Sequence, residues 1–344
     1  MTLDNPPLSL NPVQRRFRGA LLEKLSTGEF EYERAETCLC GATAAVELAP
    51  CDRFGIPVRA VLCPDCGLCR TDPRLATKDL PSFYNQIYHG LHQGVAEPDP
   101  STTLFRRAQG AAIHAYVHDL LPAGRLRVAE IGCGTGTVLR EFRAAAADRE
   151  VEVAGCEYSE AFVAAGREAG TDVRLGGPEA LRGSAPFDLV IMSHVAEHFP
   201  HPVRSLREIG ELGHPGTLYY VEVPGLLTIH RKVEYGFRLD RYLTLAHTYH
   251  FSRATLTATM ARAGFAVIRA DEQVRSVFRT APTAVTGADP AAAVEILDYL
   301  RWLDGAWRMR MIRARRSARL FAGRMARTLL GPRLYALARR QRRV

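Results

Sequence analysis

Two kinds of apolar pattern alternate along this chain from residue 101 onward. Apolar residues spaced three and four apart predict helices over 138–147, 161–169 and 202–212, and short apolar runs between them predict buried strands. A further strand over 275–279 is expected to pair back antiparallel. Such interleaving predicts βαβ units, and hence an α/β fold with a doubly wound, mostly parallel seven-stranded sheet. The other predicted strands are 126–131, 151–155, 172–175, 187–192, 218–223 and 265–268.

The region before residue 101 has a different character. A leader helix is predicted over 13–25, followed by a cysteine-rich stretch over 38–69 and a connection over 89–100 containing Gly, Pro and His. Ser101 is a plausible N-cap for a helix running to Leu121. We therefore predict three parts: a leader helix with a cysteine module (1–95), an α/β domain (101–282) and a helical tail (288–344).

Length and composition suit a folded protein, because 344 residues with 47% hydrophobic and 24% charged positions can bury a sizeable core. The apolar runs are shorter than the roughly 18 residues of a membrane span, and the first residues lack the apolar segment of a signal peptide. We expect a cytoplasmic protein.

The net charge of +8 is concentrated in the tail, where residues 301–344 hold fourteen arginines and a single acid, Asp304. Leu303, Trp307, Met311 and further apolar residues fall on one stripe of a continuous helix there. This basic amphipathic helix predicts peripheral contact with an anionic membrane, packing on the chain's own body, or contact with nucleic acid.

Six of the eight cysteines lie between residues 38 and 69, which in a reducing compartment indicates metal rather than disulfides. Cys63-Pro-Asp-Cys66-Gly has the spacing of a zinc knuckle, and Cys38-Leu-Cys40-Gly is a shorter version of it. We predict structural Zn²⁺ on Cys38, Cys40, Cys63 and Cys66, with Cys51 or Cys69 as substitutes. A redox or free-thiol cluster is the alternative.

A glycine-rich loop follows the first predicted strand of the α/β region. Glu130-Ile-Gly-Cys-Gly-Thr-Gly136 lets the backbone turn sharply and approach a ligand. A dinucleotide fold would need a further glycine at position 137, where the chain has Thr.

This loop resembles the first motif of class I S-adenosylmethionine (SAM) dependent methyltransferases. Two later segments strengthen the resemblance: Val153-Ala-Gly-Cys-Glu157, and Phe187-Asp-Leu-Val-Ile-Met192 leading into Ser193-His-Val-Ala-Glu-His198. It covers roughly 101–280 and implies that Glu157 accepts from the ribose hydroxyls. The cofactor-binding residues that it implies are Glu130, Gly132, Cys133, Gly134, Gly136, Glu157, Tyr158, Glu179 and Ser193. Many relatives place an acid that binds adenine just after the third strand, where this chain has Gly177 and, two residues later, Glu179. Glu179 is the candidate for binding adenine, and backbone groups are the alternative.

The segment from Cys63 to Arg74, followed by Phe83-Tyr84 and Tyr88, resembles the region before the methyltransferase domain in bacterial enzymes of surface-polysaccharide and deoxysugar biosynthesis. Val221-Glu222-Val-Pro224 resembles the end of the fifth strand in the same group. The resemblance implies a glycan or nucleotide-sugar acceptor.

Methyl transfer to a hydroxyl requires a proton acceptor near the acceptor oxygen. His194, just after the fourth strand, is the first candidate for the general base and His198 is the second; a structural histidine is the alternative. His194-Val-Ala-Glu197-His198 also resembles the metal segment of small-RNA 2′-O-methyltransferases, which implies a second divalent metal at Glu197 and His198, with His247 or His250 supplying a further ligand.

Residues 225–248 form an insertion that we expect over the carboxyl edge of the sheet, as a binding surface for an acidic acceptor or as a solvated lid. It contains His230, Arg231, Lys232, Tyr235, Arg238, Arg241 and Tyr242.

We therefore predict a SAM-dependent methyltransferase that acts on a sugar hydroxyl or carbon of a nucleotide-linked, lipid-linked or polymeric glycan. It would be cytoplasmic, with peripheral contact at the inner face of the plasma membrane through residues 301–344. The alternatives are an RNA methyltransferase and a zinc-stabilised scaffold without turnover.

Overall fold

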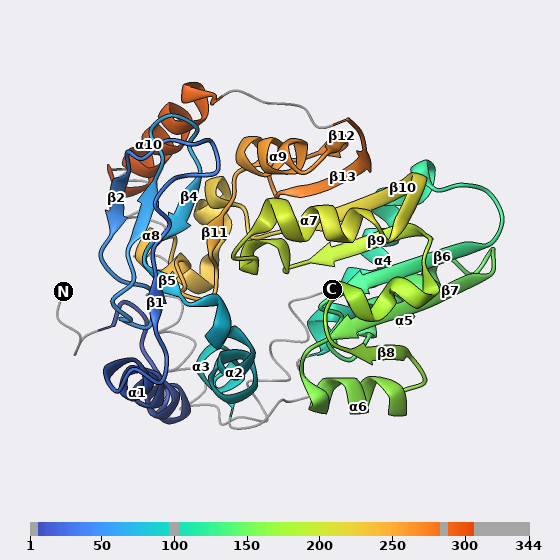
Figure 1. Cartoon of the computed structure of the whole chain (residues 1–344), viewed down its shortest axis with the longest axis horizontal. Coiled ribbons are helices and arrows are strands. Elements are labelled where there is room, and N and C mark those ends of the chain that lie inside the picture. The colour runs from blue at the N-terminus through green and yellow to red at the C-terminus, as the bar shows by residue number, and fades with distance from the viewer. Residues whose placement is uncertain (1–5, 96–102, 283–287, 306–344) are drawn as a thin grey trace, which may run out of the picture.

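A seven-stranded sheet forms the larger half of the protein (Figure 1), in a computed structural model that describes residues 6–95, 103–282 and 288–305. Its strand order is β12-β13-β10-β9-β6-β7-β8, and only β13 runs antiparallel to its neighbours. The prediction of a mostly parallel sheet with one antiparallel return is confirmed. The strands are β6 (Leu126–Ile131), β7 (Val151–Glu157), β8 (Asp172–Leu175), β9 (Phe187–Ser193), β10 (Gly213–Glu222), β12 (Phe265–Ala270) and β13 (Arg275–Thr280).

Helices cover both faces of this sheet, which explains why β9 is apolar along nearly its whole length. Leu189 and Ile191 point into a core with α4 (Thr103–Val117), α5 (Thr137–Ala145) and α6 (Glu160–Glu168). Val190 and Met192 point the opposite way, into a core with α7 (Pro202–Gly210) and α9 (Arg253–Arg262). The position predicted as the N-cap of the first helix, Ser101, lies outside the described residues.

A smaller antiparallel sheet carries the cysteine module. Its strand order is β11-β4-β3-β2, and a separate two-stranded ladder joins β1 to β5. The leader helix α1 (Pro12–Ser26) begins at Asn11, whose side chain accepts from the Gln14 N–H in a capping box. The remaining elements are β1 (Tyr32–Glu33), β2 (Val46–Ala49), β3 (Ala60–Leu62), β4 (Cys69–Thr71), β5 (Arg74–Leu75), α2 (Leu80–Phe83), α3 (His89–Gln93) and β11 (Tyr249–His250).

The two sheets are joined by segments from the second half of the chain. β11 pairs with β4, so that His250 lies opposite Cys69. The insertion over 225–248, with α8 (Leu239–Tyr242), shares a core with β2, β3 and α10 (Pro290–Gly305). The insertion is therefore a packed connection between the cysteine module and the domain, and its Arg238 pairs with Asp240 within the insertion itself.

The predicted basic helix lies almost wholly outside the described residues, which end at Gly305. Within the described part, Leu303 of the apolar stripe is buried in a core shared with the insertion and the module. None of the described helices is long and apolar enough to cross a bilayer.

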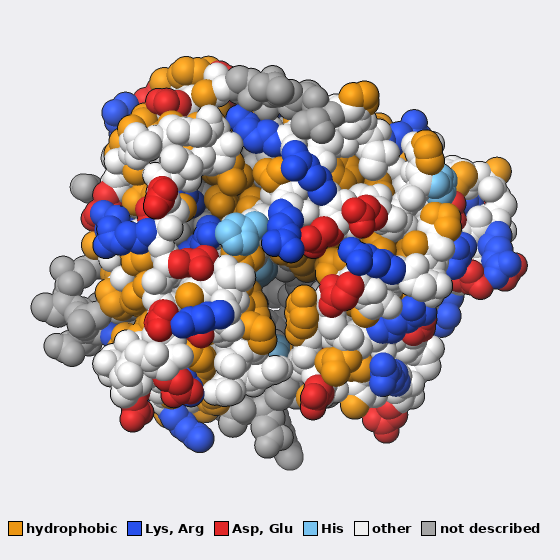
Figure 2. Space-filling view, in the orientation of Figure 1, with side chains coloured by type: hydrophobic (Ala, Val, Ile, Leu, Met, Phe, Trp, Pro, Cys, Tyr) orange, Lys and Arg blue, Asp and Glu red, His pale blue; other side chains and the backbone are white. Residues whose placement is uncertain are grey.

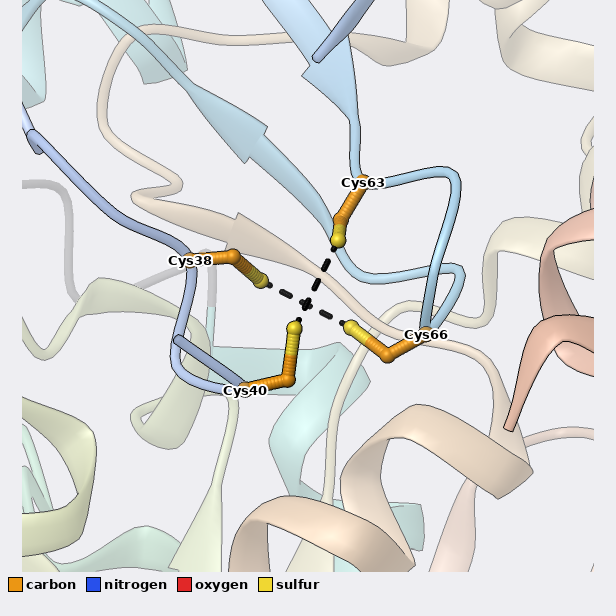
Figure 3. A group of neighbouring side chains, drawn as sticks. All are labelled: Cys38, Cys40, Cys63 and Cys66. Atoms are coloured by element: carbon orange, nitrogen blue, oxygen red, sulfur yellow. Dashed lines mark hydrogen bonds between the residues drawn. The ribbon is translucent and has the colours of Figure 1, made fainter. Parts of the chain in front are cut away.

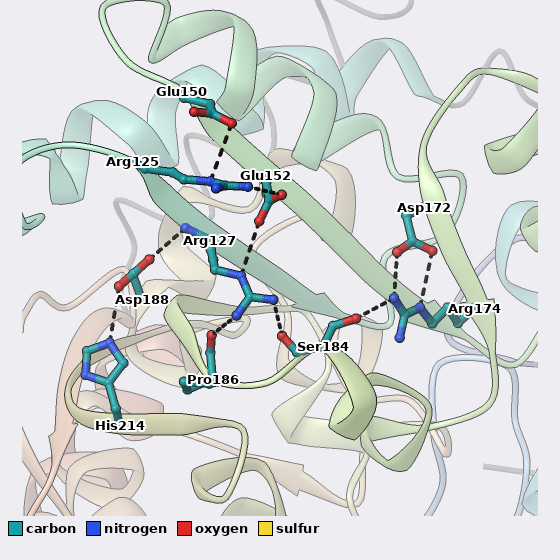
Figure 4. A network of polar contacts seen from close by, with 10 residues as sticks. All are labelled: Arg125, Arg127, Glu150, Glu152, Asp172, Arg174, Ser184, Pro186, Asp188 and His214. Atoms are coloured by element: carbon teal, nitrogen blue, oxygen red, sulfur yellow. Dashed lines mark hydrogen bonds and ion pairs between the residues drawn. The ribbon is translucent and has the colours of Figure 1, made fainter.

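Polar side chains tie together the amino ends of the parallel strands (Figure 4). Arg127 donates to the carbonyl oxygens of Pro186 and Ser184 and to Glu152. Asp188 accepts from the Arg127 backbone N–H at 2.7 Å and lies 3.2 Å from Nε2 of His214. This network leaves the carboxyl ends of the strands, at the opposite edge, for the ligand.

Candidate functional site

The glycine loop lies where the order of the sheet reverses, because β6 has β9 on one side and β7 on the other. Gly132, Gly134 and Gly136 have φ angles of 64°, 57° and 66°, a region that side chains with a Cβ rarely adopt. A Cβ at Gly132 would lie 2.8 Å from Val195, and one at Gly136 would lie 2.6 Å from Thr171. Both the backbone conformation and the space therefore require glycine.

Glu157, the predicted ribose acid, ends β7 directly beside this loop. Its carboxylate accepts from the Gly134 N–H and from the Ser159 N–H, each at 3.0 Å. The backbone of Cys133 donates to the Cys156 carbonyl, which fixes the loop against β7. The structure thus brings Gly134 and Glu157 together, as the sequence spacing predicts.

The predicted adenine side of the site is occupied by a tight turn. Gly177 donates its N–H to Glu179 at 2.7 Å, so one oxygen of that carboxylate is held by its own turn. A Cβ at Gly177 would lie 2.4 Å from the hydroxyl of Tyr158 and 2.7 Å from Glu179. Tyr158, which is 55% exposed, and Glu179 therefore flank one surface next to Glu157.

Glu130 is fully buried near the end of β6, and neither carboxylate oxygen has a hydrogen-bond partner within the part of the chain that the structure describes. Burial raises the pKa of Glu130 to about 8, against the opposing effect of the positive charge on Arg106. Arg106, on α4, is a residue that sequence reasoning missed. It lies near the loop, since a Cβ at Gly134 would be 3.4 Å from its guanidinium.

Hydrogen-bonding side chains gather where β9 and β10 end. Gln109 of α4 donates to the Ser193 hydroxyl and, at 3.1 Å, to Glu222. The Tyr220 hydroxyl donates to the same Glu222 oxygen at 3.0 Å. The predicted cofactor residue Ser193 thus belongs to a polar group that includes Gln109, which no sequence motif marks.

The two candidate bases differ in exposure. His194 adopts a φ of 58°, its N–H donates to the Glu222 carbonyl, and its side chain is 38% exposed. The His198 side chain is 14% exposed, and burial lowers its pKa. His194 is therefore the better placed of the two to meet an acceptor.

Glu197 brings the histidines together. Its Oε1 atom lies 3.6 Å from Nδ1 of His194, 3.9 Å from Nε2 of His198 and 4.0 Å from Nε2 of His247. Figure 2 shows histidine side chains around a hollow near the middle of the molecule.

Four thiols converge in the cysteine module (Figure 3). The sulfur atoms of Cys38 and Cys66 are 3.6 Å apart, as are those of Cys40 and Cys63. Zinc at about 2.3 Å from each of four sulfurs would separate them by about 3.8 Å, so the residues fit a tetrahedral Zn²⁺. The hydrogen bond between the two thiols lowers the pKa of Cys38 and raises that of Cys66, so one of the pair keeps its proton until a metal displaces it.

The predicted substitutes lie outside this group. Cys69 is buried in β4, where desolvation raises its pKa to about 12, and Cys51 lies beyond the end of β2. The first choice of four cysteines is therefore the set that the fold brings together, in spite of the short Cys38-Leu-Cys40 spacing.

Comparison with known proteins identifies the class of the larger domain. Residues 104–270 match the family model described as a methyltransferase domain. Together with the motif order and the sheet topology above, this match identifies residues 104–270 as a class I SAM-dependent methyltransferase domain. No curated protein matches the sequence.

Several solved structures are similar to this domain. DesVI from Streptomyces venezuelae is 18% identical, with 54% of this chain and 99% of that chain covered and a TM-score of 0.41. A SAM-dependent methyltransferase from Mesorhizobium loti is 19% identical, with 50% and 99% covered and a TM-score of 0.37. The cyclopropane synthase MmaA2 from Mycobacterium tuberculosis is 20% identical with a TM-score of 0.37; 47% of this chain is covered, and the match spans 62% of that enzyme.

Proposed function

We propose that the enzyme transfers a methyl group from SAM to a hydroxyl or carbon of a sugar, within a nucleotide-linked, lipid-linked or polymeric glycan. The observation that carries the proposal is the set of hydrogen-bonding side chains where β9 and β10 end: Gln109, Ser193 and Glu222 beside His194. Several donors and acceptors at one edge suit an acceptor with several hydroxyls. The resemblance of the cysteine segment and of Val221–Pro224 to polysaccharide enzymes supports the same acceptor class.

In this proposal the residues divide into a donor side and an acceptor side. The loop glycines, Glu157 and the turn of Glu179 hold SAM, which supplies an electrophilic methyl carbon when bound. For transfer to oxygen, a hydroxyl lone pair forms the new O–C bond while the C–S pair leaves with sulfur, and His194 takes the hydroxyl proton. The cysteine module holds Zn²⁺ in a structural role, since four thiolates leave no open position on the ion.

The donor half is tested by titration calorimetry of the full chain with SAM and with its demethylated product. We expect micromolar binding that is lost in Glu157→Ala and in Gly134→Arg, because the first removes the ribose acceptor and the second fills the loop. Arg127→Ala, at the opposite edge of the sheet, serves as the control and should bind SAM normally. Unchanged binding in both site variants would contradict this assignment of the cofactor site.

The acceptor half is tested by methyl incorporation from labelled SAM into a panel of nucleotide sugars and glycans, with RNA as a comparison. His194→Asn is the sharper variant, because asparagine tolerates the positive φ at this position. We expect it to lower kcat by about 10² to 10⁴ with little change in SAM affinity. Methylation of RNA and of none of the sugars would overturn the proposed acceptor class.

A further inference from the structure

Glu197 is a carboxylate in an unusual position. It lies in a short turn, Ala196–His198, directly after β9, its side chain is 2% exposed, and neither oxygen has a hydrogen-bond partner among the described residues. A buried carboxylate without a partner costs several kcal/mol. The fold therefore places two buried acceptor oxygens where a bound ligand would satisfy them.

Ring nitrogens surround this carboxylate at a spacing that hydrogen bonds do not explain. The distances of 3.9 and 4.0 Å from Oε1 to Nε2 of His198 and Nε2 of His247 exceed the roughly 2.7–3.2 Å of an N–H···O bond. Two ligand atoms at about 2.1 Å from a tetrahedral ion are about 3.4 Å apart. One donor atom each from Glu197, His198 and His247 also lies within 4.8 Å of the others, as ligands of a single ion would.

The ring of His198 is held in the orientation that a metal ligand needs. Its Nδ1 atom lies 2.8 Å from the Ala246 carbonyl oxygen and 3.0 Å from the Tyr84 hydroxyl. A proton on Nδ1, donated to the carbonyl, leaves the lone pair of Nε2 directed at the Glu197 side. This is the outer contact that metal-binding histidines usually make.

His247 is held from the other half of the molecule. Thr71 of β4 donates its hydroxyl to the His247 carbonyl at 2.7 Å and its N–H to the Thr248 carbonyl at 3.0 Å. The cluster therefore combines the carboxyl end of β9 with a loop anchored on the cysteine module. Its position is fixed only when the two halves are docked.

We propose that Glu197, His198 and His247 bind a divalent transition-metal ion, separate from the zinc of the cysteine module. Two imidazoles and one carboxylate suit Mn²⁺, Fe²⁺, Co²⁺ or Zn²⁺ better than Mg²⁺. Three protein ligands leave positions open for oxygen atoms of another molecule.

The role of this ion rests on the proposed function. The cluster follows Ser193 by four residues at the edge where the acceptor is expected, so that an acceptor hydroxyl can coordinate the ion. Coordination lowers the pKa of such a hydroxyl, which is then a better nucleophile toward the methyl carbon. His194 stays outside the ligand set and takes the proton, as above.

Metal binding is measured on the full chain that retains zinc on its cysteines. After treatment with EDTA and confirmation of one zinc per chain by elemental analysis, Mn²⁺ is titrated and the free ion is followed by electron paramagnetic resonance. Manganese is chosen because thiolate sites disfavour it. We expect one Mn²⁺ per chain, with affinity lowered more than about tenfold in Glu197→Gln and in His247→Gln.

The matched control is His214→Gln, which alters a histidine near a carboxylate at the opposite edge of the sheet and should leave Mn²⁺ affinity unchanged. Thermal unfolding of the EDTA-treated variants, which still hold zinc on their cysteines, checks that they fold; Glu197→Gln should fold well, because glutamine has nearly the same size and shape as glutamate. No Mn²⁺ or Co²⁺ binding by the wild type, or equal binding by Glu197→Gln, would overturn the site.

Activity distinguishes this inference from the proposed function. Stoichiometric Mn²⁺ binding with no methylation of any sugar supports the metal site and counts against the acceptor class. Full sugar methylation by EDTA-treated enzyme that binds Mn²⁺ normally overturns the role of the ion while leaving both the site and the acceptor class in place.

Discussion

Two carboxylates, Glu130 and Glu197, are buried in the methyltransferase domain, and none of the described residues donates a hydrogen bond to their oxygens. Both lie at the carboxyl ends of central strands, β6 and β9, where ligands bind in open α/β sheets. Burying a carboxylate without a hydrogen-bond partner costs free energy. Both carboxylates lie where a bound ligand could offset this cost.

The pH dependence of stability should reveal Glu130. Its pKa is raised from 4.5 to about 8 by burial, so between these values the folded state holds a proton that the unfolded state has lost. The contribution of Glu130 to the free energy of unfolding is therefore greatest below about pH 4.5. It falls by about 1.4 kcal/mol for each pH unit up to about 8. Glu130→Gln should remove this component.

The measurement compares thermal unfolding of the cofactor-free wild type and Glu130→Gln from pH 5 to 8.5. The difference between the two curves isolates Glu130 from other titrating groups. A constant difference across this range would show that Glu130 does not change its protonation there.

Motif spacing predicted that the glycine loop and the acid at the end of β7 lie together, because their arrangement depends on local backbone geometry. The loop glycines and Glu157 meet as expected. Arg106 and Gln109 were not predicted. A single arginine or glutamine on a predicted helix does not indicate which part of the fold that helix will pack against. Resemblance offers either His247 or His250 as the partner of Glu197, and the structure places His247 there; motif spacing does not choose between them, because both lie about fifty positions away and approach through tertiary packing.

At the scale of elements, the cysteine knuckle is attached to α10 through a glycine. Gly67 has a φ of 74°, and a Cβ there would lie 2.8 Å from the carbonyl carbon of Ala292. Gly41, in the other knuckle, has a φ of 93° and open space around it. A side chain at either glycine would strain the backbone, but only one at Gly67 would also clash with α10. Comparing substitutions at the two positions therefore distinguishes the two effects.

Gly41→Ala should lower the free energy of unfolding by about 1–2 kcal/mol, from the backbone alone. Gly67→Ala should cost more, because the helix must also move. Chemical denaturation of both variants, with zinc content measured alongside, checks this order. Equal losses would mean that the contact between the knuckle and α10 contributes nothing.

The network at the amino edge of the sheet should affect stability and not ligand binding. Arg127→Ala removes bonds to two carbonyl groups and one carboxylate, and we expect a loss of about 1–2 kcal/mol. Denaturant unfolding measures the loss, and calorimetry with SAM measures affinity. Weakened SAM binding would show that the two edges of the sheet are coupled.

Apolar runs predicted the seven strands of the large sheet. The signal is strongest for central strands such as β6 and β9, which are buried along nearly their whole length, whereas the edge strands β8 and β12 are partly exposed. The strands β1, β5 and β11 span two residues each and were not predicted. Their pairing depends on segments that tertiary packing brings alongside, and two residues are too few to show a period. The insertion over 225–248 was expected over the sheet edge, and its apolar residues in fact join the core of the module.

For the whole molecule, the zinc module should be essential to more than its own fold. Its sheet is completed by β11 and covered by α10 and the insertion. Loss of zinc should therefore lower the unfolding temperature of the entire described structure, since structural zinc contributes folding free energy directly. Cys63→Ser should lose zinc and stability together.

Cys51→Ser is the matched control, because Cys51 lies outside the four-thiol group. Zinc content by elemental analysis and unfolding temperature by calorimetry give the two readouts. A zinc-free Cys63→Ser protein that unfolds at the wild-type temperature would contradict a structural role for the metal.

Pairing between β4 and β11 also has a consequence for synthesis on the ribosome. The strand Cys69–Thr71 is synthesised well before its partner Tyr249–His250, so its backbone groups on that edge stay unpaired in the interval. At a translation rate of about 5–20 residues per second, the interval is roughly 9–36 s. During that interval one edge of the nascent sheet is open to strands of neighbouring chains. Slowing translation between the two segments should then increase the fraction of newly made protein that aggregates, whereas slowing it after residue 250 should not.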